Sequence, residues 1–194
     1  MIKKTYIPIF ILLALLGCNT ENRVGNTKEL AQEMKAMQIK RVTDAQLVAT
    51  VDEWGKQMAS VAQKALEKEM VQNPAQAGTL CQNPASLPLI AALDKEYGVT
   101  IQLMGPEDVQ NPALSAKERE LLDAYLYNAE NNLPQSDNVQ KLNDTLLVYN
   151  APVPAGSQIS AECFKNQKVS FAVWRILFDK KMVIRKLDAK KLKK

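Results

Sequence analysis

The stretch TDAQLVATVDEWGKQMASVAQKALEKEMVQNP, residues 43–74, has the strongest periodicity in the chain. Apolar residues recur in it every three or four positions, which is the spacing of one face of an α-helix. Thr43 and Gln46 have the spacing of a capping box, and Asn73-Pro74 ends the pattern. We therefore predict a helix over residues 44–72, roughly 43 Å long. Its apolar face consists of Leu47, Val51, Trp54, Met58, Val61 and Ala65, with Val48, Ala62 and Leu66 beside them.

Downstream of this helix, shorter helix and strand patterns follow one another. Residues 78–84 contain Gly and Pro and predict a break. We expect a second helix over residues 86–97, with Gly98 as a left-handed C-cap. The alternating, β-rich residues 99–104 predict a strand. A capping-box pattern opens a third helix over residues 115–128.

The last third of the chain is β-prone. We predict a strand over residues 142–150, another over 169–178 and a third over 182–187. A turn at residues 179–181 would make the last two strands a hairpin. Helices followed by a strand, a helix and several largely antiparallel strands indicate an α+β domain.

Composition excludes much ordinary enzyme chemistry. The 194 residues include no His, so His-dependent nucleophiles, His general bases, His-containing zinc sites and His-ligated haem are excluded. Glu118 and Glu120, like Asp94 and Glu96, lie two residues apart on expected helices. Residues at that spacing do not share a helix face, so we interpret them as solvated surface charge. We expect no enzyme and no metal site.

The N-terminus has the pattern of an export signal. Two lysines precede a mostly apolar run over residues 6–16, which is shorter than the roughly 20 residues that span a bilayer. Residues 15–18, Leu-Leu-Gly-Cys, resemble the bacterial lipobox, which implies cleavage before Cys18 and acylation of its sulfur. An ordinary signal peptide with an incidental Cys is the alternative. Asn19 favours outer-membrane sorting in enteric bacteria, so we expect a lipid-anchored envelope protein facing the periplasm.

Charge gathers at the other end of the chain. Residues 180–194 hold eight Lys or Arg and one acid, whereas the formal charge of the whole chain is +4. This run is interpreted as a solvated tail or as a contact with anionic lipid near the anchor. Nucleic acid is not expected as a partner of an exported lipoprotein. The chain thus divides into a signal peptide (1–17), a lipidated N-terminus and tether (18–42), a domain (43–188) and a basic tail (189–194).

Lipidation of Cys18 would leave two cysteines, Cys81 and Cys163. In an exported protein, two further thiols indicate either a disulfide or a ligand role. The residues alone leave both alternatives open.

Four weak motifs, taken in order, resemble a family of exported PAS-like proteins that carry one c-type haem. The resemblance covers roughly residues 45–178 and implies a PAS-like antiparallel sheet with a long N-terminal helix and flanking helices. The motifs are Cys81 before a helix, Tyr97-Gly98-Val99-Thr100-Ile101 at a strand entry, Asn111-Pro112-Ala113 before the helix at 115–125, and the strand 146–149 leading to Cys163.

The chain departs from this family at the haem motif. Cys163 is kept, but Asn166 and Gln167 stand where the family's Cys-x-x-Cys-His has its second Cys and its His. The family's basic segment corresponds to residues 102–108, which contain no Lys or Arg. Both departures indicate that covalent haem attachment has been lost, so we expect no cofactor, with haem retained as the alternative.

The resemblance also places both cysteines at one pocket, because the family's isolated Cys resembles an axial ligand. With haem absent, we hypothesise that Cys81 and Cys163 form a disulfide. Such a bond would close a loop of about 80 residues and stabilise the fold by around 4 kcal/mol. Two buried, unpaired thiols are the alternative.

The function that the resemblance implies is ligand binding or sensing by a membrane-anchored lipoprotein. A small apolar ligand would lie between the sheet and the helices, unless the same side chains simply fill a core. In the alternative function, Cys81 or Cys163 holds haem in a redox or gas sensor, with Met104 as a further ligand. The stripe with Trp54 and Met58 on the long helix would either pack in the core or form the contact of a homodimer. The expected pocket lining is Leu103, Met104, Tyr149, Phe171 and Trp174.

Overall fold

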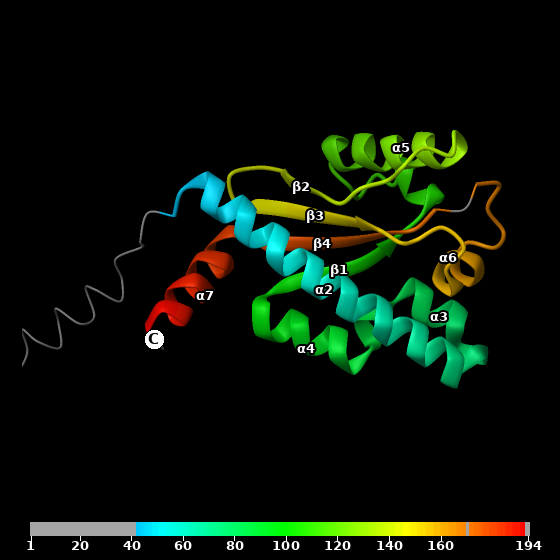
Figure 1. The fold of residues 1–194 in the computed structure, drawn as a ribbon, viewed down its shortest axis with the longest axis horizontal. Coiled ribbons are helices and arrows are strands. Elements are labelled where there is room, and N and C mark those ends of the chain that lie inside the picture. The colour runs from blue at the N-terminus through cyan, green and yellow to red at the C-terminus, as the bar shows by residue number, and fades with distance from the viewer. Residues whose placement is uncertain (1–41, 170, 193–194) are drawn as a thin grey trace, which may run out of the picture. The chain divides into compact units, whose positions relative to one another are not determined.

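The computed structural model describes residues 42–169 and 171–192, with side chains through residue 187 (Figure 1). These residues belong to one compact unit, Lys40–Lys194. The predicted signal peptide, Cys18 and nearly all of the predicted tether lie outside the described residues. No helix in the described part of the chain combines the length and the apolarity needed to cross a bilayer.

A four-stranded antiparallel sheet forms the centre of the domain. Its spatial order is β1-β4-β3-β2, so the last strand of the chain lies between the first and the third (Figure 1). With helices around this sheet, the α+β class is confirmed. The strands are β1 (Val99–Met104), β2 (Asn138–Lys141), β3 (Leu146–Pro152) and β4 (Val173–Asp179).

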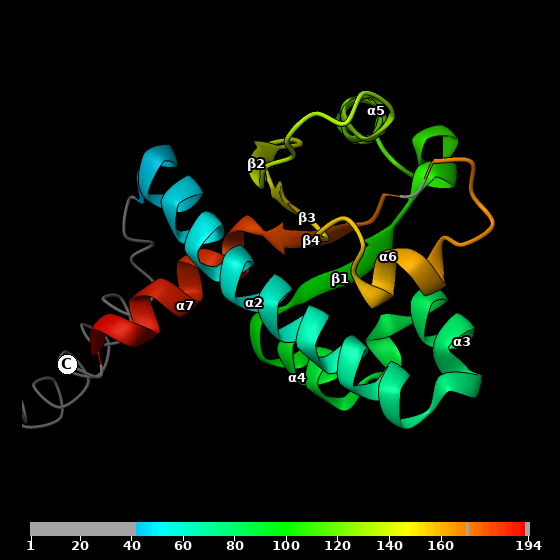
Figure 2. The ribbon, with the colours of Figure 1, turned by 45° about the vertical axis from the view of Figure 1, so that its right-hand side comes forward.

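Helices cover both faces of the sheet (Figures 1 and 2). One face packs against α2 (Asp44–Gln72), α4 (Pro88–Tyr97) and α7 (Lys180–Leu192), and the opposite face packs against α5 (Ala116–Glu130). Each face has its own cluster of buried apolar side chains. Shorter helical segments join these elements: η1 (Pro74–Gln76), α3 (Ala77–Gln82), η2 (Pro84–Ser86), η3 (Pro106–Gln110) and α6 (Gln158–Cys163).

Helix α2 has the bounds that the periodicity predicts. The Thr43 hydroxyl accepts a hydrogen bond from the Gln46 N–H, and the Gln46 side chain accepts one from the Thr43 N–H, both at 3.2 Å. The predicted face is buried from Leu47 to Met58. Beyond Met58 the buried residues are Ala62, Leu66 and Met70, spaced four apart, and the sequence pattern places the first two beside the face. Val61 is instead 38% exposed.

Several other sequence predictions hold, with small changes in their bounds. Gly98 has φ 63° and caps α4, and β1 covers the predicted residues. Ser115 and Glu118 form the predicted capping box of α5. Residues 142–150 are not one strand. Residues 142–145 form the loop of a hairpin that joins β2 to β3, and β3 begins at Leu146. The predicted break at residues 78–84 contains most of α3 and the start of η2.

The predicted C-terminal hairpin is wrong, since α7 follows β4 directly. The Asp179 carboxylate accepts hydrogen bonds from the N–H groups of Lys181, at 2.7 Å, and Met182, at 3.1 Å, which starts a helix. Val183 and Leu187 lie four residues apart and both pack on the core. A short apolar run fits strand and helix patterns alike, and here the packing selects the helix.

Tyr149 of β3 packs directly on the backbone of α2 at Gly55. A Cβ atom added at Gly55 would lie 2.3 Å from Cγ of the Tyr149 ring. Gly55 therefore permits the Tyr149 ring to lie against the backbone of α2, where any larger residue would clash.

We predict that Gly55→Ala destabilises the domain. Overpacking costs about 1–3 kcal/mol, which exceeds the gain of at most about 1 kcal/mol in helix propensity. Urea unfolding measures the change in the free energy of unfolding. Gly78→Ala is the matched control, because Gly78 lies in α3 with open space around its missing Cβ. Equal stabilisation by both substitutions would contradict the contact.

Candidate functional site

A disulfide joins Cys81 of α3 to Cys163 at the end of α6, with their Cα atoms 5.5 Å apart. Of the two arrangements that the sequence left open, the structure has the bonded one. The cysteines are 82 residues apart, and closing such a loop stabilises the folded state by around 4 kcal/mol in the chain-entropy description. The bond holds together two short helices that also contact α2.

The residues of the degenerate haem motif form a turn after α6. Asn166 is exposed, Gln167 is half-buried, and the Gln167 N–H donates to the Phe164 carbonyl at 3.0 Å. Sequence reasoning missed Phe164, which is 8% exposed. Its ring covers Gly105, where an added Cβ would lie 2.0 Å from Cε1 of Phe164. Gly105 was the available signal, because only glycine permits that approach.

These residues do not fit a haem. The sulfur atoms of Cys81 and Cys163 are bonded to each other, so neither is available to iron while the disulfide is intact. Met104 belongs to the apolar cluster on the α5 face, whereas Cys81 belongs to the cluster on the α2 face.

The five residues that the sequence suggested as a pocket lining lie on both faces of the sheet. Tyr149 and Trp174 are buried in the cluster under α2, with Leu103 packed beside them. Met104 and Phe171 lie in the cluster under α5. Successive side chains of a strand point to opposite faces, and Leu103 and Met104 are neighbours in β1.

A groove opens on the α5 side of the sheet, between the carboxyl end of α5 and the loop after β3. Its volume is about 540 Å³. None of the twelve described residues that line it carries a charge. Three amides and three prolines contribute, namely Asn128, Asn132, Gln135, Pro134, Pro152 and Pro154. The others are Ala129, Leu133, Val153, Ala155, Ser160 and Phe171, of which only Phe171 was predicted.

A buried ion pair lies under the amino end of α5. Arg175 of β4 donates from Nε and Nη2 to Oε1 of Glu118, at 2.9 and 2.6 Å, and from Nη1 to the side chain of Gln102 at 2.7 Å. The Ser115 N–H and hydroxyl donate to the other Glu118 oxygen at 2.9 and 2.7 Å. Glu118 is 6% exposed, so its interpretation as surface charge is wrong.

The pair belongs to a polar row that crosses all four strands. Gln102, Arg175, Asn150 and Asn138 are successive cross-strand partners, so they share the α5 face of the sheet. Burial alone would raise the pKa of Glu118, but Ser115 and Arg175 outweigh it and hold that pKa below its ordinary value of 4.5. The hydrogen bonds of this carboxylate go to Arg175 and Ser115.

Two buried tyrosines are also held in their neutral form. The Tyr149 hydroxyl donates to Asp137 at 2.6 Å, and burial together with that carboxylate raises the pKa of Tyr149 far above its ordinary value. Burial and the charge of Asp137 raise the pKa of Tyr125 to about 12. The Tyr125 hydroxyl donates to the Ser136 carbonyl at 2.8 Å. The two tyrosine hydroxyls donate structural hydrogen bonds and stay protonated near neutral pH.

The predicted dimer stripe of α2 lies in the core of its own chain. Trp54 is 5% exposed and Met58 is 3% exposed. The Trp54 ring meets Tyr97 of α4 edge to face, with ring centroids 5.4 Å apart. These two side chains are therefore not available to a second copy. A homodimer formed through other surfaces stays a prediction.

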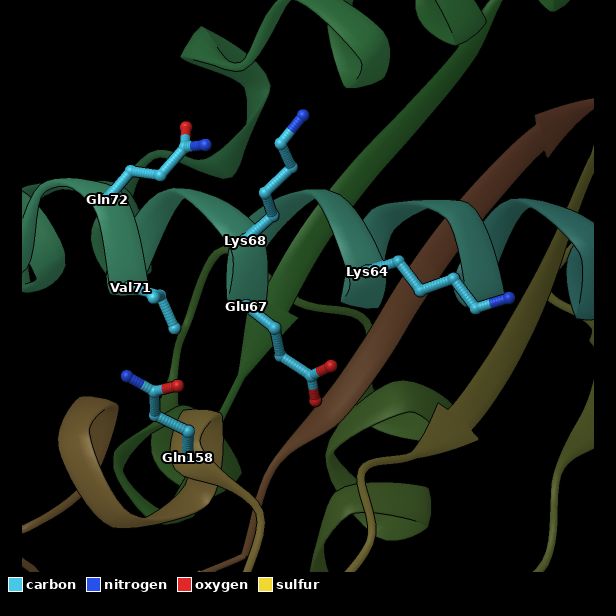
Figure 3. Close-up of a pocket in the computed structure, with 6 residues that line it drawn as sticks. All are labelled: Lys64, Glu67, Lys68, Val71, Gln72 and Gln158. Carbon is cyan, nitrogen blue, oxygen red and sulfur yellow. The ribbon is translucent and has the colours of Figure 1, made fainter.

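An open hollow of about 570 Å³ lies between α2 and α6 (Figure 3). In Figure 3, Glu67 and Val71 lie on the side of α2 nearer Gln158 of α6, and Lys68 points the opposite way. Lys64 and Lys68 are both exposed. The hollow has no buried charged side chain among its described lining residues, and we assign no ligand to it.

Comparison with known proteins adds no relative. Protein-family models, curated proteins and solved structures were each searched, and none matches this chain.

We predict that Glu118→Gln destabilises the domain by about 3 kcal/mol at neutral pH, because it leaves the buried Arg175 guanidinium without its counter-charge. Urea unfolding gives the free energy, with Glu120→Gln on the exposed side of α5 as the matched control.

The same substitution tests the pH dependence. A carboxyl whose pKa is lowered by folding contributes stability above its unfolded-state pKa and loses it as the pH falls. Wild-type stability should therefore fall below about pH 4.5 more steeply than that of Glu118→Gln. Parallel pH profiles would contradict a stabilising charge on Glu118.

Proposed function

We propose that this chain is a lipid-anchored protein of the bacterial cell envelope whose PAS-like domain binds a small, uncharged ligand and catalyses no reaction. The observation that carries the binding role is the groove of about 540 Å³ beside α5. Its volume falls in the range of roughly 300–1,000 Å³ that is usual for small-molecule sites.

The chemistry of the groove supports an uncharged, partly polar ligand. Charged residues make up 24% of the chain, yet none of the described lining residues is charged. Prolines and Phe171 offer apolar surface, and amide side chains such as Asn128 and Asn132 offer donors and acceptors. An ion would find no partner of opposite charge in this lining.

The PAS-like interpretation rests on the resemblance and on where the groove lies. In such a domain the ligand lies between the sheet and helices. Here α5 covers one face of an antiparallel sheet (Figure 2). The groove is lined by the carboxyl end of α5 and by the loop after β3. The resemblance implies a long N-terminal helix, and α2, which packs on the other face of the sheet, is our candidate for it.

Location in the envelope is supported by the lipobox-like residues before Cys18 and by the disulfide between Cys81 and Cys163. Disulfides persist in exported proteins, where the surroundings are oxidising. We propose that acylated Cys18 holds the protein in the outer membrane, with the domain in the periplasm. The non-enzymatic role fits the commitment of Glu118 to Arg175.

Binding in the groove is tested with Nile red, an uncharged dye that fluoresces in apolar sites. We expect saturable fluorescence with the native protein and its loss in Ala129→Trp, whose indole would fill the groove. Ala124→Trp is the matched control, because Ala124 is exposed on the same helix. Equal dye binding by the two variants would contradict a site in the groove.

Lipidation is tested separately, by metabolic labelling with an alkyne fatty acid in a bacterial host. We expect Cys18→Ser to lose the label and the Cys81→Ser variant to keep it, since only Cys18 follows the lipobox-like residues. A label that survives Cys18→Ser would overturn the anchor.

A further inference from the structure

We propose that α7 lies on an anionic lipid surface, namely the headgroups of the membrane that holds Cys18. The lipid anchor of the proposed function is a premise of this inference. The contact gives the domain one orientation on the membrane and turns the groove away from it.

Charge is the first argument. Residues 180–194 have a surplus of seven positive charges, whereas the whole chain has a formal charge of only +4. The remainder of the chain is therefore net negative. An anionic surface attracts the C-terminal segment and repels the rest, so it selects one end of the molecule.

Exposure is the second argument. Lys181 and Arg185 lie one helical turn apart in α7, and both are exposed. No described residue forms an ion pair with either, while Lys180 pairs with Asp44 at 3.6 Å and Lys186 pairs with Glu96. Val183 holds the helix on the core with 2% exposure. The helix thus presents cations on a face that the domain does not use.

Placement is the third argument. Helix α7 lies beside the amino-terminal half of α2 in both views of the fold, and the Lys180–Asp44 pair joins them (Figures 1 and 2). Asp44 is the first residue of α2, and 25 residues separate it from Cys18 in sequence. The basic helix therefore adjoins the end of the domain that the tether enters. A tether raises the local concentration of lipid, so modest attraction suffices.

The consequence for the groove follows from strand β3. Leu146, at the start of β3, pairs with Asp179 immediately before α7. Pro152, at the other end of β3, lines the groove. A membrane contact at α7 therefore leaves the groove at the far end of the strand, open to a ligand in solution.

The test is vesicle flotation with residues 18–194 carrying Cys18→Ser, so that no acyl chain contributes. Vesicles contain either phosphatidylcholine alone or phosphatidylcholine with phosphatidylglycerol. Each Lys or Arg near an anionic surface strengthens binding roughly fivefold at moderate salt. We expect binding only to the anionic vesicles, weakened at least about tenfold by K181Q/R185Q and weakened again by added salt.

The control variant is K64Q/K68Q, which removes the same two charges from exposed positions in the second half of α2 (Figure 3). We expect it to bind as the parent does. Equal weakening by both variants, or equal binding to both kinds of vesicle, would overturn the proposal. Because the protein in this assay has no acyl chain, its result is separate from the labelling of Cys18.

Discussion

Strand β4 is the constraint on which the rest of the domain depends. It is paired on both sides, with β1 and with β3, and its side chains alternate between two separate cores. Trp174, Ile176 and Phe178 pack under α2, whereas Val173 and Arg175 face α5. Because a strand alternates with a period of two, a shift of one residue would exchange the two sets and place Arg175 among the aromatic rings of the α2 core.

The two cores have different chemistry. The α2 face is apolar, closely packed and closed at one end by the Cys81–Cys163 disulfide. The α5 face holds a polar row and the Glu118–Arg175 pair, and its uncharged groove opens at the edge. A buried ion pair adds little net stability, but removing one of its partners is costly. The Glu118–Arg175 pair therefore fixes the position of α5 on the sheet. The proposed binding role belongs to this second face.

In the proposed arrangement, the membrane contact and the groove lie at opposite ends of the sheet. Helix α2 begins at Asp44 and α7 begins where β4 ends, and the Lys180–Asp44 pair joins the two helices, so the start of the described domain and the basic helix lie at the same end of the sheet. The groove lies at the other end of β3. An anchored domain that binds a dissolved ligand needs this separation, because the headgroups would otherwise cover the opening of its site.

Local signals in the sequence determined the elements whose ends have their own chemistry. The capping box at Thr43 and the left-handed Gly98 depend on neighbours within a few residues, so α2 and the end of α4 could be predicted. The tertiary structure alone decided that residues 182–187 form a helix, because their apolar pattern fits either element and packing against the core settles it. It also decided that Glu118 is buried, since its partner Arg175 is 57 residues away. The groove is likewise assembled from segments distant in sequence, and no local pattern encodes such a meeting.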